Sequence, residues 1–240
     1  MNNTVANITN HNSTAQRSVD YAYLYFTIAA VIGILICLFG LAGNITVFWY
    51  LCFKIKKNKY TVYIINLSVA DSIFLTFSAL ILMMYINTLL NPRSYFQGKY
   101  TVYIFLEIFY DGAQYSGMFI LTAISLERCL SFLFPFWYQC NRPQNLSFIT
   151  CAVVWIIGCS ESLTENLVCS EEAFATQTSQ CTAVQIMTFG VSIVICLPIM
   201  VISSCTLIFK VRRTLSEQYP MKLLHHYHSN FYIHFFCHPI

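Results

Sequence analysis

The chain has 240 residues, of which 57% are hydrophobic and only 10% are charged, and its net charge is +3. Soluble proteins carry about 25% charged residues, so this composition cannot cover a soluble surface and excludes a soluble enzyme. The apolar content also excludes a disordered chain, and the small net charge gives no indication of a nucleic-acid partner. The sequence therefore predicts a protein of the lipid bilayer, and since no catalytic constellation is visible in it, we expect no enzyme.

The N-terminal segment, residues 1–23, contains three Asn-x-Ser/Thr sequons, at Asn2, Asn7 and Asn12. Such sequons accept glycans on the outer surface of secreted and membrane proteins, so we expect a glycosylated extracellular segment. No cationic region followed by a short apolar run and a small-residue cleavage site precedes the first long apolar stretch. We therefore expect no cleaved signal peptide.

Five apolar segments follow, and each is long enough to cross the hydrocarbon core, which requires about 20 helical residues. We expect helices near 24–53, 60–90, 100–134, 146–168 and 182–209. Helices fit because backbone polar groups in lipid must be satisfied within the segment. The predicted fold is an all-α, polytopic membrane helix bundle over 24–209, followed by a cytoplasmic loop and tail over 210–240.

The positive charges are distributed unevenly between the two sides of this predicted bundle. With the N-terminus outside, the outer segments contain three, which are Arg17, Arg93 and Lys99. The inner segments contain ten, which are Lys54, Lys56, Lys57, Lys59, Arg128, Arg142, Lys210, Arg212, Arg213 and Lys222. Lys and Arg accumulate in cytoplasmic loops. The bias therefore predicts a plasma-membrane protein with an extracellular N-terminus.

Two polar residues are expected near the middle of the membrane. Asn44 lies ten residues before Lys54, and Asp71 lies twelve residues after Lys59, which is roughly 15 Å and 18 Å along a helix. A carboxylate at that depth is costly and indicates a functional site. One interpretation is a packing contact in which Asp71 and Asn44 are hydrogen-bonded. The other is an ion or proton site, with sodium near Asp71 as the candidate, and both can hold at once.

Four acidic residues lie in the outer halves of two predicted helices. Glu107 and Asp111 are spaced i,i+4 in the third segment, and Glu161 and Glu165 repeat that spacing in the fourth, so each pair shares a helix face. Charged residues within membrane spans face the protein interior or a water-filled cavity. The four carboxylates therefore favour a cationic extracellular ligand, such as a basic peptide or an amine. A solvated rim with salt bridges to the outer basic residues is the alternative.

Motifs in all five segments resemble those of one receptor family, the rhodopsin-type G-protein-coupled receptors. In chain order they are Gly43-Asn44, Leu67-Ser68-Val69-Ala70-Asp71, Glu127-Arg128-Cys129, Trp155 and Pro198. The Glu-Arg-Cys sequence within 122–131, together with Lys-Tyr-Thr-Val-Tyr-Ile at 59–64, is similar to the MAS and MAS-related subfamily. The resemblance covers roughly residues 25–222. It implies the first five helices of a seven-helix receptor fold that senses an extracellular ligand and signals to heterotrimeric G proteins.

The resemblance also assigns a role to the end of the third helix. It implies that Glu127 and Arg128 pair at the cytoplasmic end, and that Arg128 is released to meet the G protein on activation. Such an ion pair holds one conformation and breaks in another. The alternative is an arginine that extends from a helix end to the membrane interface.

A disulfide is implied in the outer loop between the fourth and fifth helices. Most receptors of this type join the top of the third helix to that loop, but this chain has no cysteine between Cys52 and Cys129. A Cys169–Cys181 bridge resembles the MAS-related pattern. Two free thiols are the alternative.

The resemblance places one acid in a ligand contact. Glu165, four residues before Cys169, matches an acidic ligand contact in some MAS-related receptors, and Gln185 stands where those relatives have the second acid. Aminergic receptors carry Asp where this chain has Tyr110, with Asp111 one residue later. A basic peptide is therefore the preferred ligand over a biogenic amine.

The C-terminal residues depart from the family pattern. After Leu224 the sequence is rich in histidine, and the Trp-Pro and Asn-Pro motifs of the sixth and seventh helices are absent. The histidine spacing fits no zinc signature. We therefore expect a receptor truncated after the fifth helix. Besides a signalling receptor, this leaves a non-signalling pseudoreceptor, retained inside the cell, that associates with full-length relatives.

Overall fold

The computed structural model describes residues 2–56, 58–91, 99–135, 138, 142–143, 145–170 and 179–213. In this part of the chain, five helices are long and apolar enough to cross a membrane, and they are Tyr21–Phe53, Lys59–Leu90, Tyr100–Leu133, Leu146–Cys169 and Ser179–Arg213. The five predicted spans are therefore confirmed, with boundaries that shift by only a few residues. The predicted membrane helix bundle is confirmed as well.

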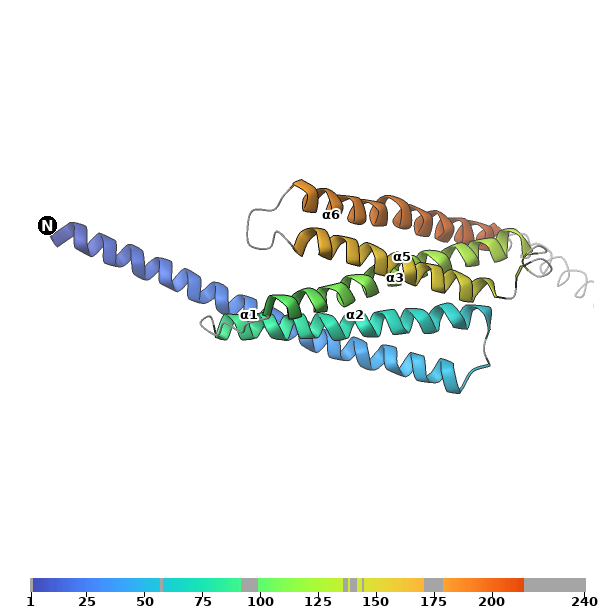
Figure 1. Ribbon diagram of the computed structural model, residues 1–240, viewed down its shortest axis with the longest axis horizontal. Helices are drawn as coiled ribbons and strands as arrows, with labels where there is room; N and C mark the ends of the chain where they lie inside the picture. The colour runs from blue at the N-terminus through green and yellow to red at the C-terminus, as the bar shows by residue number, and fades with distance from the viewer. Residues whose placement is uncertain are drawn as a thin grey trace, which may run out of the picture.

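The helices run up and down in alternation, because short connections place chain neighbours antiparallel (Figure 1). The first four are α1 (Asn2–Phe53), α2 (Lys59–Leu90), α3 (Lys99–Leu133) and α5 (Leu146–Ser170). The last span consists of α6 (Ser179–Val191), the π-helical segment η1 (Ser192–Cys196) and helical residues 197–213. The polar N-terminal segment is helical and continues α1, so this part of α1 projects beyond the other helices in Figure 1.

The helices form an open row in which α2, α3 and α5 are the inner helices and contact one another. α1 packs on α2, α2 packs on α3 and α5, and α3 packs along α5, which in turn contacts α6. Among the described elements, α1 and α6 do not touch each other. α1 and α6 are therefore the edge helices of this bundle.

Small residues bring α3 and α5 close together. A Cβ at Gly158 on α5 would lie 2.8 Å from the backbone nitrogen of Ser116 on α3, so a larger residue cannot fit there. Nearby, the Ser162 hydroxyl donates a 2.7 Å hydrogen bond to the backbone oxygen of Ile108. Such small-residue contacts and interhelical hydrogen bonds replace the hydrophobic driving force in lipid.

A polar contact connects α2 to α5 beside the buried core. The core residues Tyr63, Ala70, Ile120 and Cys151 come from α2, α3 and α5. Next to them, Trp155 Nε1 donates a 3.2 Å hydrogen bond to Asn66 Oδ1. This contact and the core hold the three helices together at this level.

The last span contains a π-helical turn, which is wider than an α-helical turn, just before Pro198. Pro198 has no backbone N–H, and its ring collides with the carbonyl four residues earlier in a regular α-helix. The π-helical turn η1 ends two residues before it. Such wider turns are one of the ways in which a helix accommodates the disruption.

The helices of the bundle have two common ends, one on each side of the predicted membrane, and these ends differ in charge. We call the end formed by Phe53, Lys59, Leu133, Leu146 and residue 213 the basic end; it is the right-hand end in Figure 1. Its described basic residues are Lys54, Lys56, Lys59, Arg128, Arg142, Lys210, Arg212 and Arg213. We call the opposite half the acidic end, and its described acids are Glu107, Asp111, Glu161 and Glu165.

Candidate functional site

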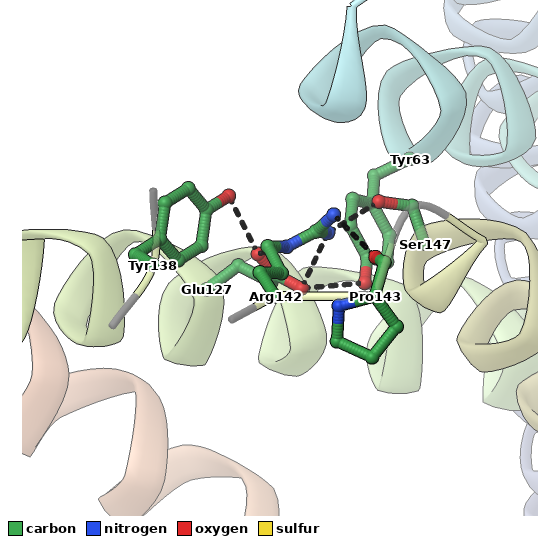
Figure 2. Close-up of polar contacts among 6 residues, drawn as sticks. All are labelled: Tyr63, Glu127, Tyr138, Arg142, Pro143 and Ser147. Carbon is green, nitrogen blue, oxygen red and sulfur yellow. Dashed lines mark hydrogen bonds and ion pairs between the residues drawn. The ribbon is translucent and has the colours of Figure 1, made fainter. Parts of the chain in front are cut away.

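A buried ion pair lies at the basic end, close to the end of α3 (Figure 2). Arg142, which precedes α5, approaches Glu127 of α3 with 2.8 Å between Nη2 and Oε1, and its Nε donates to Oε2 at 3.2 Å. This two-pronged contact is the strongest geometry available to a guanidinium and a carboxylate. The side chains are 0% and 8% exposed, respectively, so each charge depends on the other for compensation.

Further hydroxyl groups complete the coordination of this pair. Tyr138 donates to Glu127 Oε2 at 2.8 Å, and Tyr63 of α2 donates to Oε1 at 3.2 Å. Arg142 Nη2 also donates to the Ser147 hydroxyl of α5 at 2.6 Å. We call these five residues the Glu127 cluster (Figure 2). The cluster connects α2, α3 and α5 to the segment between α3 and α5.

The surroundings of Tyr138 and Arg142 in the cluster favour their protonated forms. The Arg142 guanidinium carbon and Lys59 Nζ each lie 5.2 Å from the centre of the Tyr138 ring, which also stacks on Tyr60. Burial raises the pKa of Tyr138, and its hydrogen bond to Glu127 acts in the same direction. Burial by itself lowers the pKa of Arg142, but the Glu127 carboxylate outweighs that effect and the net pKa is raised. Both groups therefore remain hydrogen-bond donors at neutral pH.

The prediction that Glu127 pairs with Arg128 is wrong, because the structure pairs Glu127 with Arg142. Consecutive residues on a helix do not face each other, and the Arg128 side chain is exposed while Glu127 is buried. Arg142 was visible in the sequence only as one more inner cation. Its role depends on the path of the chain between α3 and α5, which residue spacing does not encode.

The four predicted carboxylates of the acidic end lie on α3 and α5, and neutral side chains donate hydrogen bonds to Glu165 and Asp111. Glu165 Oε2 accepts hydrogen bonds from the Tyr115 hydroxyl at 2.5 Å and from the Thr188 hydroxyl of α6 at 3.4 Å. Asp111 Oδ2 accepts one from Asn166 Nδ2 at 2.9 Å. We call the four acids, Glu107, Asp111, Glu161 and Glu165, the acidic cluster.

No basic side chain that the structure describes forms an ion pair with the acidic cluster. Glu165 is close enough to the other three acids for their charges to interact. Among the side chains that the structure describes, the single ion pair is the one between Arg142 and Glu127. Glu161 Oε2 is buried and has no hydrogen-bond partner. Arg93 and the side chain of Lys99, the predicted alternative partners, lie outside the described part of the chain.

The remaining predicted ligand contacts are Tyr110 and Gln185, and both side chains lie away from the acidic cluster. Tyr110 stacks on the Phe74 ring of α2 at 4.8 Å between centroids, so it faces away from the Asp111 contact on α5. Gln185 is exposed on α6, and its backbone oxygen accepts a hydrogen bond from the Thr188 hydroxyl. Neither side chain contributes a described contact to the four acids.

Three polar partners of the acids were missed in the sequence. Tyr115 follows Asp111 by four residues and therefore lies on the same helix face, which was an available signal. Asn166 and Thr188 gave no such signal. Their roles depend on how α5 and α6 are rotated against α3, which no single segment encodes.

The two mid-membrane residues do not form the predicted contact. Asn44 Nδ2 donates to the backbone oxygen of Gly40 at 3.1 Å, and no hydrogen bond joins it to Asp71 among the described residues. Asp71 faces α3 instead, where its Oδ1 would lie 3.8 Å from a Cβ at Gly117. Hard cations prefer several oxygen ligands, and Gly117 supplies no side-chain oxygen there. A sodium site near Asp71 stays a prediction.

A disulfide links Cys169 at the end of α5 to Cys181 in α6, with 5.0 Å between the Cα atoms. The predicted bridge is confirmed. The sequons at Asn2, Asn7 and Asn12 lie on α1, and their glycosylation remains a prediction. The histidine-rich tail lies outside the described residues.

Comparison with known proteins identifies the chain's relatives. Residues 43–229 match the family described as 7 transmembrane receptor (rhodopsin family). Proto-oncogene Mas of Rattus norvegicus is 35% identical over 185 residues, which are 77% of this chain and 56% of that protein. Proto-oncogene Mas of Homo sapiens is 33% identical over 216 residues, 90% and 65% of the two chains. Mas-related G-protein coupled receptor member H of Mus musculus is 34% identical over 198 residues, 82% and 57%. The chain thus spans somewhat more than half the length of these relatives.

Proposed function

Since the chain belongs to the rhodopsin family of seven-transmembrane receptors, with Mas and Mas-related receptors as relatives, we propose that it senses an extracellular cationic ligand and signals to heterotrimeric G proteins. On this proposal the acidic end faces the extracellular side and the basic end faces the cytoplasm. The concentration of Lys and Arg at the basic end supports this orientation. Enzymatic removal of glycans from Asn2, Asn7 or Asn12, seen as increased gel mobility, tests it.

The observation that carries the ligand proposal is the set of carboxylates without a described cation. Charged groups within membrane spans are normally paired or face water. Tyr115 and Thr188 orient Glu165 by hydrogen bonds from neutral hydroxyl groups, and no described basic side chain pairs with it. A positively charged group of a ligand would supply that compensation, so Glu165 is the proposed anchor.

The distribution of the acids favours a basic peptide over an amine. Glu107 and Asp111 lie one helical turn apart on α3, with about 5–6 Å between their Cβ atoms, and the other two acids lie on α5. A ligand with several cationic groups can engage both helices. Tyr110, at the position where aminergic receptors carry Asp, packs on Phe74.

The basic end supports the proposed coupling to a G protein. Arg128 lies near the C-terminal end of α3 and is exposed. It is not the ion-pair partner of Glu127. Its guanidinium is therefore available to hydrogen-bond acceptors of a cytoplasmic partner. The Glu127 cluster holds the neighbouring segment against the helices.

The test uses the tagged full chain in cells that lack any related receptor. Fluorescent peptides with Lys or Arg at successive positions, and matched peptides with norleucine there, are compared for binding and for G-protein activation. We expect saturable binding of the basic peptides, reduced in Glu165→Gln, and activation that Arg128→Ala abolishes. Equal binding of basic and neutral peptides at equal surface expression would contradict the proposal.

A second function, association with a full-length relative, is favoured by the open row of helices. The edge helices α1 and α6 carry large exposed apolar side chains, such as Phe39 at 87% and Met187 at 70%. Co-purification of the chain with a co-expressed Mas receptor, together with a changed response of that receptor, would support this function. Signalling by the chain in the absence of any relative would favour the receptor function instead.

A further inference from the structure

Glu127 has no hydrogen-bonding capacity left for the arginine that follows it in the sequence. Each of its two oxygens accepts one hydrogen bond from Arg142 and one from a tyrosine, Tyr63 or Tyr138. A charge that is buried and satisfied by an ion pair with additional hydrogen bonds is far less able to attract a second cation. Arg128 is thus excluded from the carboxylate by other residues as well as by helix geometry.

We propose that Arg142 is a positioning residue that occupies Glu127 and thereby keeps Arg128 available at the basic end. The coupling surface is then set by a residue outside α3, and activation has no Glu127–Arg128 pair to break. The signalling part of this inference rests on the proposed G-protein coupling, whereas the pairing part does not.

The contacts of Arg142 explain why this position requires arginine. Its Nε and Nη2 contact the two Glu127 oxygens, Nη2 also reaches the Ser147 hydroxyl, and Nη1 donates to the backbone oxygen of Pro143 at 3.4 Å. A lysine provides one compact ammonium group and cannot reproduce this fork. Arg142→Lys should therefore retain the charge and only part of the geometry, whereas Arg142→Gln should lose both.

Loss of the Arg142 charge has a specific consequence. The Glu127 carboxylate would then be left without its counter-ion. Arg128, which directly follows Glu127 in the sequence, is the cation that could replace Arg142. A rotamer change that lets Arg128 approach Glu127 would withdraw it from the coupling surface. Arg142→Gln is therefore expected to reduce coupling through Glu127, and removal of the Glu127 charge should reverse that reduction.

A thermal double-mutant cycle tests the pairing without any signalling. The full chain is purified in detergent as wild type, Glu127→Gln, Arg142→Gln, Arg128→Gln and the two double variants that contain Glu127→Gln. We expect Arg142→Gln to lower the melting temperature by roughly 6–20 °C, because it leaves a buried charge unpaired. The loss should be much smaller when Glu127→Gln is also present, while Arg128→Gln and Glu127→Gln should act additively. Should Arg142→Gln fail to fold, Arg142→Lys and Ser147→Ala replace it in the cycle.

G-protein recruitment per receptor at the cell surface tests the positioning role. We expect Arg142→Gln to reduce recruitment several-fold, Arg142→Lys to restore part of it, and Glu127→Gln/Arg142→Gln to return to the level of Glu127→Gln alone. Because Glu127→Gln is also expected to restore stability, recruitment is compared per folded surface receptor at a temperature at which every variant is folded, so that loss of fold is not counted as loss of coupling. Thermal coupling of Glu127 to Arg128 instead of Arg142, or unrescued loss of recruitment in the double variant, would overturn the inference. A wild-type chain without recruitment would refute the proposed function, and the thermal cycle would still decide the pairing.

Discussion

At the basic end the Glu127 carboxylate meets Arg142 at 2.8 Å and is buried, whereas at the acidic end Glu165 meets only the neutral hydroxyls of Tyr115 and Thr188 among the described residues. The first arrangement is complete without any further molecule. The second leaves several interacting carboxylates without a described counter-ion. Since both lie in or beside membrane spans, where isolated charge is costly, the difference is the basis for the proposal that a ligand's cation completes the acidic cluster.

The comparison also shows that two glutamates of one chain, Glu127 and Glu165, have different partners. Glu127, on α3, accepts hydrogen bonds from Tyr63 of α2 and from Arg142, which precedes α5 and in turn donates to Ser147 of α5. Glu165, on α5, accepts hydrogen bonds from Tyr115 of α3 and Thr188 of α6, which are neutral donors, so the described helices orient it without supplying a counter-ion. Stability should therefore respond to changes at the basic end, and ligand affinity to changes at the acidic end.

The largest expected effect is on stability, at the basic end. Glu127→Ala leaves Arg142 buried without a counter-ion, which typically costs about 3–5 kcal/mol. Thermal unfolding of the detergent-solubilised chain should show this loss. The matched control is Arg128→Ala, which removes an exposed charge and should change stability by less than about 0.5 kcal/mol. Equal losses in the two variants would remove the distinction between the two arginines.

The second-largest effect is expected at the Cys169–Cys181 disulfide beside the acidic end. Cys169→Ser or Cys181→Ser opens the bridge between α5 and α6, which should lower stability by about 3 kcal/mol in the chain-entropy account. Non-reducing mass spectrometry of the wild type checks the cross-link itself. The double serine variant should be no less stable than either single variant. Free thiols at both positions in surface-expressed protein would speak against the bridge.

A smaller effect is expected when Glu165 loses its orientation but keeps its charge. Tyr115→Phe removes the 2.5 Å hydrogen bond to Glu165 and leaves the ring in place. Hydrogen bonds to charged groups contribute about 1.5–3 kcal/mol, so binding of the basic peptide should weaken by a part of that amount. Thr188→Val, which removes the longer contact, should weaken binding less. An unchanged Kd in both variants would show that the hydroxyls do not organise the site.

The smallest expected effect is a gain in affinity. Gln185→Glu adds to the four acids of α3 and α5 a fifth carboxylate, on α6, at an exposed position one turn from Thr188. An exposed charge pair contributes about 0.2–1 kcal/mol, so the basic peptide should bind slightly more tightly and lose that gain at high salt. Gln185→Ala is the matched control. Weaker binding of the glutamate variant would place the ligand away from this face of α6.

The sequence was sufficient for those features that depend on one segment at a time. Hydropathy placed all five spans, and i,i+4 spacing placed Glu161 and Glu165 on one face. It was insufficient for contacts between segments. Arg142 reaches Glu127 because of the chain path between α3 and α5, and Asn44 turns to Gly40 instead of Asp71 because of how α1 is rotated against α2. The Cys169–Cys181 bridge was available only through the resemblance to a receptor subfamily.

The most direct test of the central claim, that Glu165 is the carboxylate that a ligand's cation completes, is a binding cycle between protein and ligand. The Kd of a basic peptide and of its norleucine variant is measured on the wild type and on Glu165→Gln at equal surface expression. Our account predicts that removing the peptide's cation weakens binding to the wild type by about 2–5 kcal/mol, but has little effect on Glu165→Gln. The same loss on both proteins would contradict it, because the ligand's charge would then be recognised elsewhere.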